Sequence, residues 1–258
     1  MNDVGDARDF PRRVPERRIR FALAGMCVLL LIGGSLMGLA MIASGQTFSD
    51  LVSENAVNWK VKDVSTHTNT GAVQIWDYWF PGMVDGALEV PFYDATDGWF
   101  TVYVNNVWEG DLTGMKITAA FEIRQESDEV PIFVARRADT QVQLRLQFQT
   151  TGGAYEPSDL WWSAEDYIVL TSYELQGPVT DPDILNTLLV LEVELTPELW
   201  LNHDGQLGST VLSEFEAAIA DIHEIGFSFG RTCSLASGVA LTQGDATFVL
   251  KSFELQAA

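Results

Sequence analysis

The stretch "QVQLRLQFQ" (residues 141–149) decides the fold class, because its polar and apolar residues alternate without exception. Its apolar side chains share one face of an extended chain: Val142, Leu144, Leu146 and Phe148. Its polar side chains share the other face: Gln141, Gln143, Arg145, Gln147 and Gln149. Strict alternation is typical of an antiparallel strand with one side in a core and the other in water. We therefore expect a half-buried strand here.

Similar strands recur along the chain, separated by Gly, Pro, Asn and Asp. In "KITAAFEIR" (116–124) the residues expected to point inward are Ile117, Ala119, Phe121 and Ile123. In "TLLVLEVEL" (187–195) they are Leu189, Leu191, Val193 and Leu195. The closing "ATFVLKSFEL" (246–255) changes phase between Leu250 and Phe253, which predicts a β-bulge near Lys251–Ser252. The pattern favours an all-β domain over residues 56–258, either a β-sandwich or a jelly roll.

One short helix interrupts the strands. Leu212, Phe215, Ile219 and Ile222 recur at helical spacing, so they would share one face. Ser209 or Thr210 would cap its start; if the helix starts later, Ser213 and Glu216 would form a capping box. We expect this helix to cover an open end of the sandwich.

Four motifs carry a resemblance to known proteins. They are "WEGDLTGMKITAAFEI" (108–123), "VELTPELW" (193–200), "FEAAIADIHEIGFSFG" (215–230) and "GDATFVLKSFEL" (244–255). Together they resemble exported bacterial jelly-roll sandwiches of the galactose-binding-like and laminin-domain-IV-like kind, over about residues 98–255. The resemblance implies a jelly roll that binds sugars or proteins and rarely catalyses a reaction. Many sugar-binding relatives hold a structural calcium with an Asp in the closing strand, and "ATFVLKSFEL" has none.

The N-terminal region predicts a membrane anchor. Residues 1–20 carry six arginines, and residues 21–49 carry no charge. The apolar stretch 21–44 is long enough to cross a bilayer, whereas a signal peptide has an apolar core of roughly 7 to 15 residues. The positive-inside rule places the N-terminus in the cytoplasm and the rest in the periplasm or outside the cell. Ala43 and Gly45 also fit a cleavage site, which leaves removal of this segment as the alternative.

Two short features adjoin the anchor. Residues 45–55 are expected to form a stalk between the membrane and the sandwich. Gly33, Gly34 and Gly38 in the apolar stretch are small enough for close packing against another membrane helix. Such residues are also common in unpaired spans, so packing is one of two interpretations.

The exported part is strongly acidic. Residues 46–258 contain 9 basic and 32 acidic side chains, which gives a net charge of −23. A nucleic acid is therefore excluded as a partner, because phosphate binding needs a cationic surface. Of the two cysteines, only Cys233 lies beyond the predicted anchor, so the domain has no internal disulfide. Its stability must come from its core.

Asn202-His203-Asp204-Gly205-Gln206 has oxygen donors at alternating positions, as a calcium loop does. An EF-hand loop would need a bidentate Glu where this chain has Ser213. Asn, Asp and Gly are also the residues that turns require, so we interpret the stretch as a turn. We expect no cofactor; a structural calcium is possible but no motif supports it.

Trp161 and Trp162 are the best candidates for ligand binding. Adjacent residues of a strand point to opposite faces, so at most one of these rings is expected in the core. Acidic residues around them would accept hydrogen bonds from sugar hydroxyls: Glu156, Asp159, Glu165 and Asp166. The alternative is that both rings fill the core or its edge.

These observations predict a membrane-anchored extracytoplasmic module that binds without catalysis. Its expected ligand is a carbohydrate or envelope glycan. The alternative is an accessory subunit of a membrane protein complex, with the sandwich covering the outer face of that complex. A glycosidase would need two carboxylates about 5 to 10 Å apart, and no motif in the chain indicates such a pair.

Overall fold

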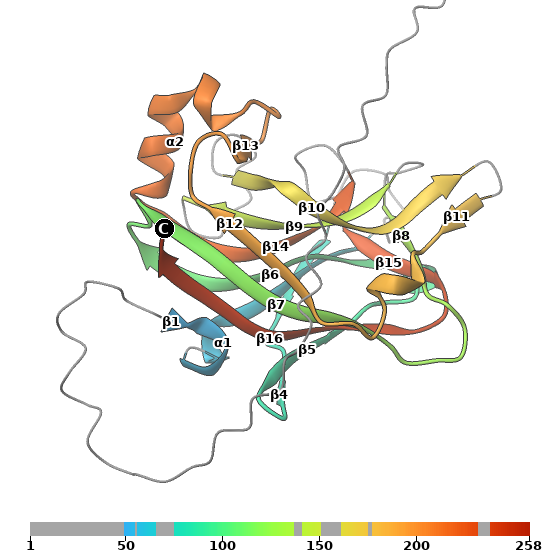
Figure 1. Ribbon diagram of the computed structural model, residues 1–258. Helices are drawn as coiled ribbons and strands as arrows, with labels where there is room; N and C mark the ends of the chain where they lie inside the picture. Colours follow the sequence, from blue (N-terminus) through green and yellow to red (C-terminus); the bar gives the residue numbers. More distant parts are fainter. Residues whose placement is uncertain are drawn as a thin grey trace, which may run out of the picture. The chain divides into compact units, whose positions relative to one another are not determined.

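The computed structural model describes residues 49–54, 56–65, 75–136, 141–150, 161–174, 177–231 and 238–258. Within these ranges the chain is mostly β-structure: two antiparallel sheets pack face to face as a sandwich (Figure 1). No helix of the described ranges is long and apolar enough to span a membrane. The predicted anchor, including Gly33, Gly34 and Gly38, lies outside the described residues.

The smaller sheet has six strands in the order β12-β7-β16-β5-β4, with β1 paired to β16. Their bounds are β1 (Ser49–Asp50), β4 (Met83–Val84), β5 (Ala87–Pro91), β7 (Met115–Gln125), β12 (Leu189–Glu194) and β16 (Ala246–Ala257). Its two longest strands, β7 and β16, pair along most of their length.

The larger sheet has ten strands, and its main path runs β11-β10-β9-β14-β6-β15-β8. The bounds along this path are β6 (Trp99–Gly110), β8 (Ile132–Ala135), β9 (Val142–Gln149), β10 (Trp161–Glu174), β11 (Gly177–Val179), β14 (Ile222–Arg231) and β15 (Val239–Gln243). Off the path, β13 (Trp200–Asn202) pairs with β10, while β2 (Trp59–Ser65) lies between β6 and β3 (Ile75–Trp79).

Helical segments are short. They comprise α1 (Leu51–Glu54), α2 (Leu212–Ile219) and the 3-10 turns η1 (Ala56–Asn58), η2 (Ala95–Asp97), η3 (Pro182–Ile184) and η4 (Gly208–Thr210). Because α1 is a single turn, α2 is the one longer helix in the described part of the chain. Phe215 of α2 is fully buried and packs against Trp162 of β10, with ring centroids 5.1 Å apart. The helix therefore covers one end of the sandwich, as expected.

The core between the sheets combines aliphatic side chains with aromatic rings, many of which meet edge to face. Phe227 of β14 lies 5.4 Å from Phe121 of β7 and 5.1 Å from Phe248 of β16, measured between ring centroids. Such pairs stabilise beyond the area that they bury. These rings come from both sheets, so they fix how the sheets stack.

Several predictions are confirmed. In β7 and β12 the residues expected inside are buried and alternate with exposed or partly exposed ones. The register of β16 against β7 shifts between Leu250 and Ser252, where the change of phase predicted a bulge.

The predicted helix cap is wrong. Val211 occupies the N-cap position of α2 and its side chain makes no capping hydrogen bond. Thr210 belongs instead to η4, where its hydroxyl donates to the carbonyl of Leu207 at 2.7 Å. Leu212, expected on the buried face, is the first residue of the helix and is 46% exposed, whereas Phe215 and Ile219 are buried.

Residues 49–54 were expected to lie in a stalk, and the structure packs them on the sandwich. Ser49 and Asp50 form β1 against β16, and Leu51 and Val52 of α1 are both fully buried. The indole Nε1 of Trp59 donates to the carbonyl of Leu51 at 3.0 Å, which holds this turn on the core.

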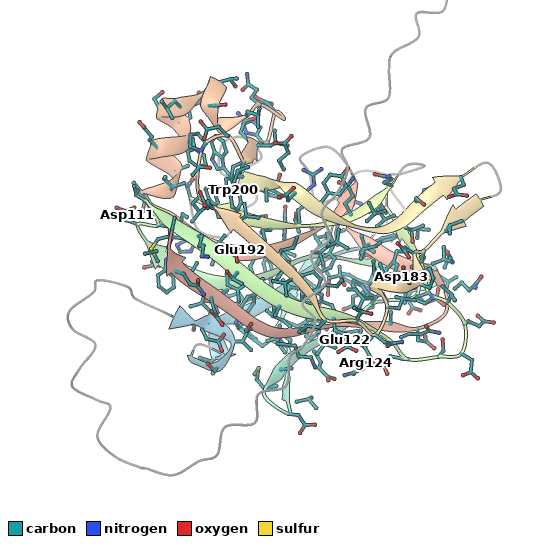
Figure 2. The ribbon with its side chains drawn as sticks, in the orientation of Figure 1. Asp111, Glu122, Arg124, Asp183, Glu192 and Trp200 are labelled. Carbon is teal, nitrogen blue, oxygen red and sulfur yellow. The ribbon has the colours of Figure 1, made fainter. Side chains whose placement is uncertain are left out.

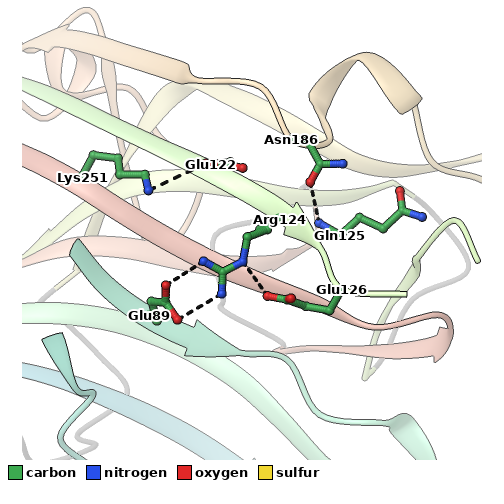
Figure 3. Close-up of polar contacts among 7 residues, drawn as sticks. All are labelled: Glu89, Glu122, Arg124, Gln125, Glu126, Asn186 and Lys251. Atoms are coloured by element: carbon green, nitrogen blue, oxygen red, sulfur yellow. Dashed lines mark hydrogen bonds and ion pairs between the residues drawn. The ribbon is translucent and has the colours of Figure 1, made fainter. Parts of the chain in front are cut away.

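The outward side of the smaller sheet is a solvated, charged surface, which we call the charged face. Figure 3 shows four of its side chains, which come from three strands: Glu89, Glu122, Arg124 and Lys251. Lys116 and Glu192 belong to the same face. Arg124 donates to both carboxylate oxygens of Glu89, at 2.6 and 3.0 Å. Figure 2 shows Glu122 and Arg124 along β7 and Glu192 on β12.

Candidate functional site

The outward side of the larger sheet differs from the charged face. Its polar and aromatic side chains alternate with core residues such as Leu144, Leu146 and Ile225, so they point away from the smaller sheet. We call this surface the polar face and define it by Lys62, Tyr103, Asn105, Gln143, Arg145, Gln147, Gln149, Trp161, Tyr167 and Glu224. Most of these side chains are buried. The prediction of a half-buried strand at 141–149 is therefore wrong, because both faces of β9 are buried.

A buried ion pair occupies one part of the polar face. Lys62 of β2 donates to Glu224 of β14 at 2.6 Å, and each side chain is only 2% exposed. The amide of Asn105, on the intervening strand β6, donates to the same Glu224 oxygen at 3.2 Å. The ammonium group of Lys62 also lies 5.5 Å from the ring centroid of Tyr78 and 5.9 Å from that of Tyr103. Each buried charge thus has a charged partner and further polar or aromatic contacts.

A glycine allows two amides to meet across a strand. Gly226 of β14 lies between Asn105 of β6 and Gln147 of β9 in the register. The amide of Gln147 donates to the side-chain oxygen of Asn105 at 2.7 Å. A Cβ atom at position 226 would lie 2.2 Å from the carbonyl oxygen of Val104, where no real Cβ fits. The missing side chain therefore makes room for the Gln147–Asn105 hydrogen bond.

A β-bulge shapes the other part of the polar face. Ser163 of β10 pairs with Gln147 and Tyr167 pairs with Arg145, so three residues of β10 oppose one residue of β9. Arg145 donates to the carbonyl of Ala164 inside this bulge at 3.2 Å. Its guanidinium also lies 4.6 Å from the ring centroid of Tyr167. The bulge pushes Glu165 and Asp166 into solvent, where both are exposed. Bulges of this kind often re-aim side chains beside binding sites.

Besides the Ala164 carbonyl and the Tyr167 ring, the guanidinium of Arg145 contacts a third group, the side chain of Gln143. Its Nε and Nη2 atoms both donate to the side-chain oxygen of Gln143, at 3.1 and 2.8 Å. Together with the bond to the Ala164 carbonyl, these contacts fix the plane against which Tyr167 stacks. The ring of Tyr167 is thus fixed in orientation and remains partly exposed.

The structure separates the two candidate tryptophans, as the alternation of a strand requires. Trp162 is 3% exposed and stacks on Phe148 of the core, with ring centroids 6.2 Å apart. Trp161 points to the polar face, is partly exposed, and meets Tyr103 edge-on at 4.8 Å. Asp166 is exposed in the bulge of the same strand, whereas Glu156 and Asp159 lie outside the described residues.

A buried carboxyl group lies on the inner side of β2. Asp63 is fully buried, and its Oδ2 accepts hydrogen bonds from Trp79 Nε1 at 2.6 Å and Tyr93 OH at 2.8 Å. Burial raises the pKa of Asp63, and the hydrogen bonds from Tyr93 and Trp79 oppose that rise. Burial, followed by the bond to Asp63, also raises the pKa of the Tyr93 hydroxyl. These bonds tie β2 to β3 and to the segment after β5, so the group serves the framework.

The stretch Asn202–Gln206 forms a turn. The side-chain oxygen of Asn202 accepts from the backbone N–H groups of Asp204 and Gln206, at 3.1 and 2.8 Å. Gly205 takes a φ of 76°, in the region that favours glycine. Among the residues that the structure describes, no three His, Cys, Asp or Glu side chains are grouped to hold a metal ion.

Sequence reasoning missed Lys62, Asn105, Tyr167 and Glu224. Lys62 and Glu224 are 162 residues apart and meet only through the order of strands in the sheet. One local signal was available: Gly226 stands inside the strand pattern "IHEIGFSFG" (222–230), and a glycine there often marks a close approach of another group.

Comparison with known proteins finds no protein family whose profile matches this chain and no curated protein with significant similarity to it. Function is therefore inferred from the sandwich and its polar face.

Proposed function

We propose that the chain is a membrane-anchored extracytoplasmic module that binds a carbohydrate or envelope glycan without catalysis, using the polar face. The observation that carries this proposal is the arrangement of β10, in which Trp161 and Tyr167 face the same side, opposite Gln149 and Arg145, and the bulge leaves Asp166 exposed next to Tyr167. The position of the domain outside the cytoplasm follows from the predicted anchor at residues 21–44.

The chemistry of the polar face suits a sugar. The apolar side of a sugar ring packs on an aromatic ring, and its hydroxyl groups need both donors and acceptors. Trp161 and Tyr167 supply partly exposed aromatic surface, and Asp166 supplies an exposed carboxylate. Binding sites commonly combine such aromatic surface with a few well-placed polar groups.

Preorganisation favours binding at this place. The three hydrogen bonds of Arg145 fix the plane on which Tyr167 stacks before any ligand arrives. A group that is already ordered loses less conformational entropy on binding. The two-sheet antiparallel sandwich also agrees with the resemblance to galactose-binding-like jelly rolls, whose members commonly bind sugars.

The test is retention of the full chain, in mild detergent, on an array of envelope glycans and on purified cell-wall polysaccharide. We expect Trp161→Ala and Tyr167→Ala each to weaken binding by about tenfold or more, or about 1.4 kcal/mol. Phe80→Ala is the control, because Phe80 is an aromatic residue 67% exposed on another part of the domain. Equal retention of all three variants would contradict the site, and no retention of the unaltered chain would contradict glycan binding.

One observation favours the accessory subunit as a second candidate. Val190 is 45% exposed on β12, the end strand of the smaller sheet on its main path, and Leu188, just before that strand, is 58% exposed. Exposed apolar side chains on an edge strand suit a protein partner that extends the sheet. Purification from the native membrane should then bring down partner proteins in fixed ratio, and Val190→Lys should release them. Purification of the chain alone would contradict this candidate.

A further inference from the structure

One amide of the polar face is buried without a hydrogen bond. Gln149 of β9 is 5% exposed, and within the described part of the chain its side chain neither donates nor accepts a hydrogen bond. By contrast, these buried polar side chains of the same face each make at least one: Lys62, Asn105, Gln143, Arg145, Gln147 and Glu224. Burial of an unpaired polar group is unfavourable, so the amide of Gln149 points to a partner from outside the domain, either water or a ligand.

The strand register places Gln149 between an aromatic ring and a carboxylate. Trp161 of β10 lies opposite Gln149 on one side, and Glu224 of β14 lies opposite it on the other. Side chains directly opposite each other on antiparallel strands have Cβ atoms about 4.5 to 5.5 Å apart. All three side chains belong to the polar face, and Trp161 is partly exposed. We call these three residues, which form one line across three strands, the Gln149 row.

Glu224 adds an unpaired acceptor to the Gln149 row. Lys62 and Asn105 both donate to its Oε2 atom, at 2.6 and 3.2 Å. Its other oxygen, Oε1, accepts a hydrogen bond from no group of the described residues. The charge of Glu224 is balanced by its ion pair with Lys62. The row therefore offers the N–H groups and oxygen of an amide together with one further acceptor oxygen.

This set of groups selects a chemical class of ligand. A hydroxyl group both donates and accepts, so it can pair with an N–H of Gln149 and with a free oxygen. A carboxylate only accepts and would lie beside Glu224, whereas an ammonium only donates and would meet the charge of Lys62. Lys60 faces the same side, but it stands on β2, three strands or about 14 Å from β9. The Gln149 row is therefore suited to an uncharged, hydroxylated group.

We propose that Gln149 pairs with a hydroxyl group of an uncharged sugar whose ring packs on Trp161, and that Glu224 Oε1 accepts a second hydrogen bond from the same sugar. The inference rests on the proposed function and narrows its ligand to neutral glycans. Acidic polysaccharides are rejected, because they bring acceptors and negative charge to a row that already holds a carboxylate. A site built to pair a hydroxyl discriminates strongly, since its buried polar groups stay unpaired with any other ligand. Gln149 thus determines specificity, and Trp161 supplies contact area.

The first half of the test compares two glutamines on the same side of β9. Gln149→Met removes an amide without a partner, whereas Gln147→Met removes the amide that donates to Asn105 at 2.7 Å. Urea unfolding of the full chain in mild detergent measures both. We expect the midpoint to fall for Gln147→Met and to stay or rise for Gln149→Met, because loss of an unpaired buried group is not destabilising. An equal fall in both variants would overturn the inference, since Gln149 would then be held by the protein itself.

The second half of the test measures retention on neutral glycans and on the same glycans oxidised to carboxylates at their primary hydroxyl groups. We expect Gln149→Met to weaken retention on the neutral glycans by about tenfold or more, and oxidation to weaken retention of the unaltered chain. Gln256→Met is the control, because Gln256 lies on β16 of the smaller sheet.

Two results would overturn this inference while glycan binding stands. They are equal retention of Gln149→Met and the unaltered chain, and equal or tighter retention on the oxidised glycans. If the unaltered chain is retained on no glycan, neutral or acidic, the proposed function fails and this inference fails with it.

Discussion

The two outward faces of this sandwich come from strands with the same alternation and reach opposite physical states. On the charged face, the ion-paired side chains of Lys116, Glu192, Arg124 and Glu89 are between 22% and 57% exposed. On the polar face, Lys62 and Glu224 are each 2% exposed. Alternation therefore reports which residues face away from the core, and it does not report whether water reaches them.

The difference matters energetically. An exposed ion pair contributes about 0 to 1 kcal/mol, because water and salt screen it and because ordering two long side chains costs entropy. A buried pair gains little over apolar packing when both partners are present, yet removal of one partner leaves an unpaired charge that costs about 3 to 5 kcal/mol. The same contact type thus predicts very different mutational effects on the two faces.

The largest effect is expected from the buried pair. Lys62→Met should lower the free energy of unfolding by about 3 to 5 kcal/mol, because Glu224 would stay buried without its cation. Lys62→Met combined with Glu224→Leu should recover most of that loss. Urea unfolding of the full chain in mild detergent measures both. A loss below about 1 kcal/mol in the single variant would contradict the prediction, because the buried pair would then contribute no more than an exposed ion pair does.

The next effect is expected from Gly226→Ala. The added methyl group would press on the carbonyl oxygen of Val104 at 2.2 Å and on the amide of Asn105, so the strand must shift. We expect a loss of about 1 to 3 kcal/mol by the same measurement. Gly82→Ala is the matched control, since a Cβ atom there meets nothing within 4 Å. Equal effects of the two substitutions would show that the close approach across β14 does not matter.

A third prediction uses pH to contrast two carboxyl groups. Burial raises the pKa of Asp63 above its usual 3.8, so the folded protein holds this proton more tightly than the unfolded chain does. Its contribution to stability is complete below pH 3.8 and is lost as the pH rises through the folded value. Asp63→Asn cannot ionise, so its stability relative to the unaltered chain should rise with pH. The slope should be about 1.4 kcal/mol for each pH unit between the unfolded and the folded pKa of Asp63.

Glu89, on the charged face, should show the opposite slope. The hydrogen bonds from Arg124 lower the pKa of Glu89 below its usual 4.5, so its contribution is present above pH 4.5 and is lost as the pH falls. The deficit of Glu89→Gln should therefore shrink toward acid pH. Thermal unfolding between pH 3 and 8 checks both variants, and slopes of the same sign would contradict the contrast.

The smallest effect is expected from Lys116→Ala. Lys116 and Glu192 lie 3.1 Å apart, and their side chains are 24% and 57% exposed. Its loss should lower the free energy of unfolding by only about 0.2 to 1 kcal/mol, and added salt should reduce that difference further. A loss as large as that of Lys62→Met would mean that the two faces differ less than their exposure indicates.

The sequence predicted what depends on local period and missed what depends on neighbours in space. Alternation located β7, β9 and β12, and a change of phase located the bulge of β16. The bulge of β10 was not predicted. It is defined by how β10 pairs with β9, and the sequence around Ala164 shows no change of phase in its apolar residues that would indicate it. The helix cap was misplaced because η4 takes up Thr210 before the helix starts.

The candidate site could be predicted only in part for the same reason. Trp161 and Asp166 were predicted because an aromatic pair and acidic residues lie close together in the sequence. In the structure Trp161 is partly exposed and Asp166 is exposed. Arg145 was placed on the correct side of β9 and expected in water, whereas Tyr167, which stacks on it from the next strand, was not singled out. Lys62, Asn105 and Glu224 lie on three separate strands, and no spacing within any one of them indicates the others.

The pairing of β1 with β16 has a mechanical consequence. Ser49 lies opposite Leu255 and Asp50 opposite Glu254, so the start and the end of the domain are joined by two residue pairs. Under the proposed function, tension between a ligand on the polar face and the proposed membrane anchor would reach the domain at Ser49 and act on this short pairing first. Peeling β1 and α1 from β16 would lengthen the chain between the proposed anchor and the sandwich while both sheets keep their remaining strand pairs. The first residues of the domain would thus yield before the sandwich does.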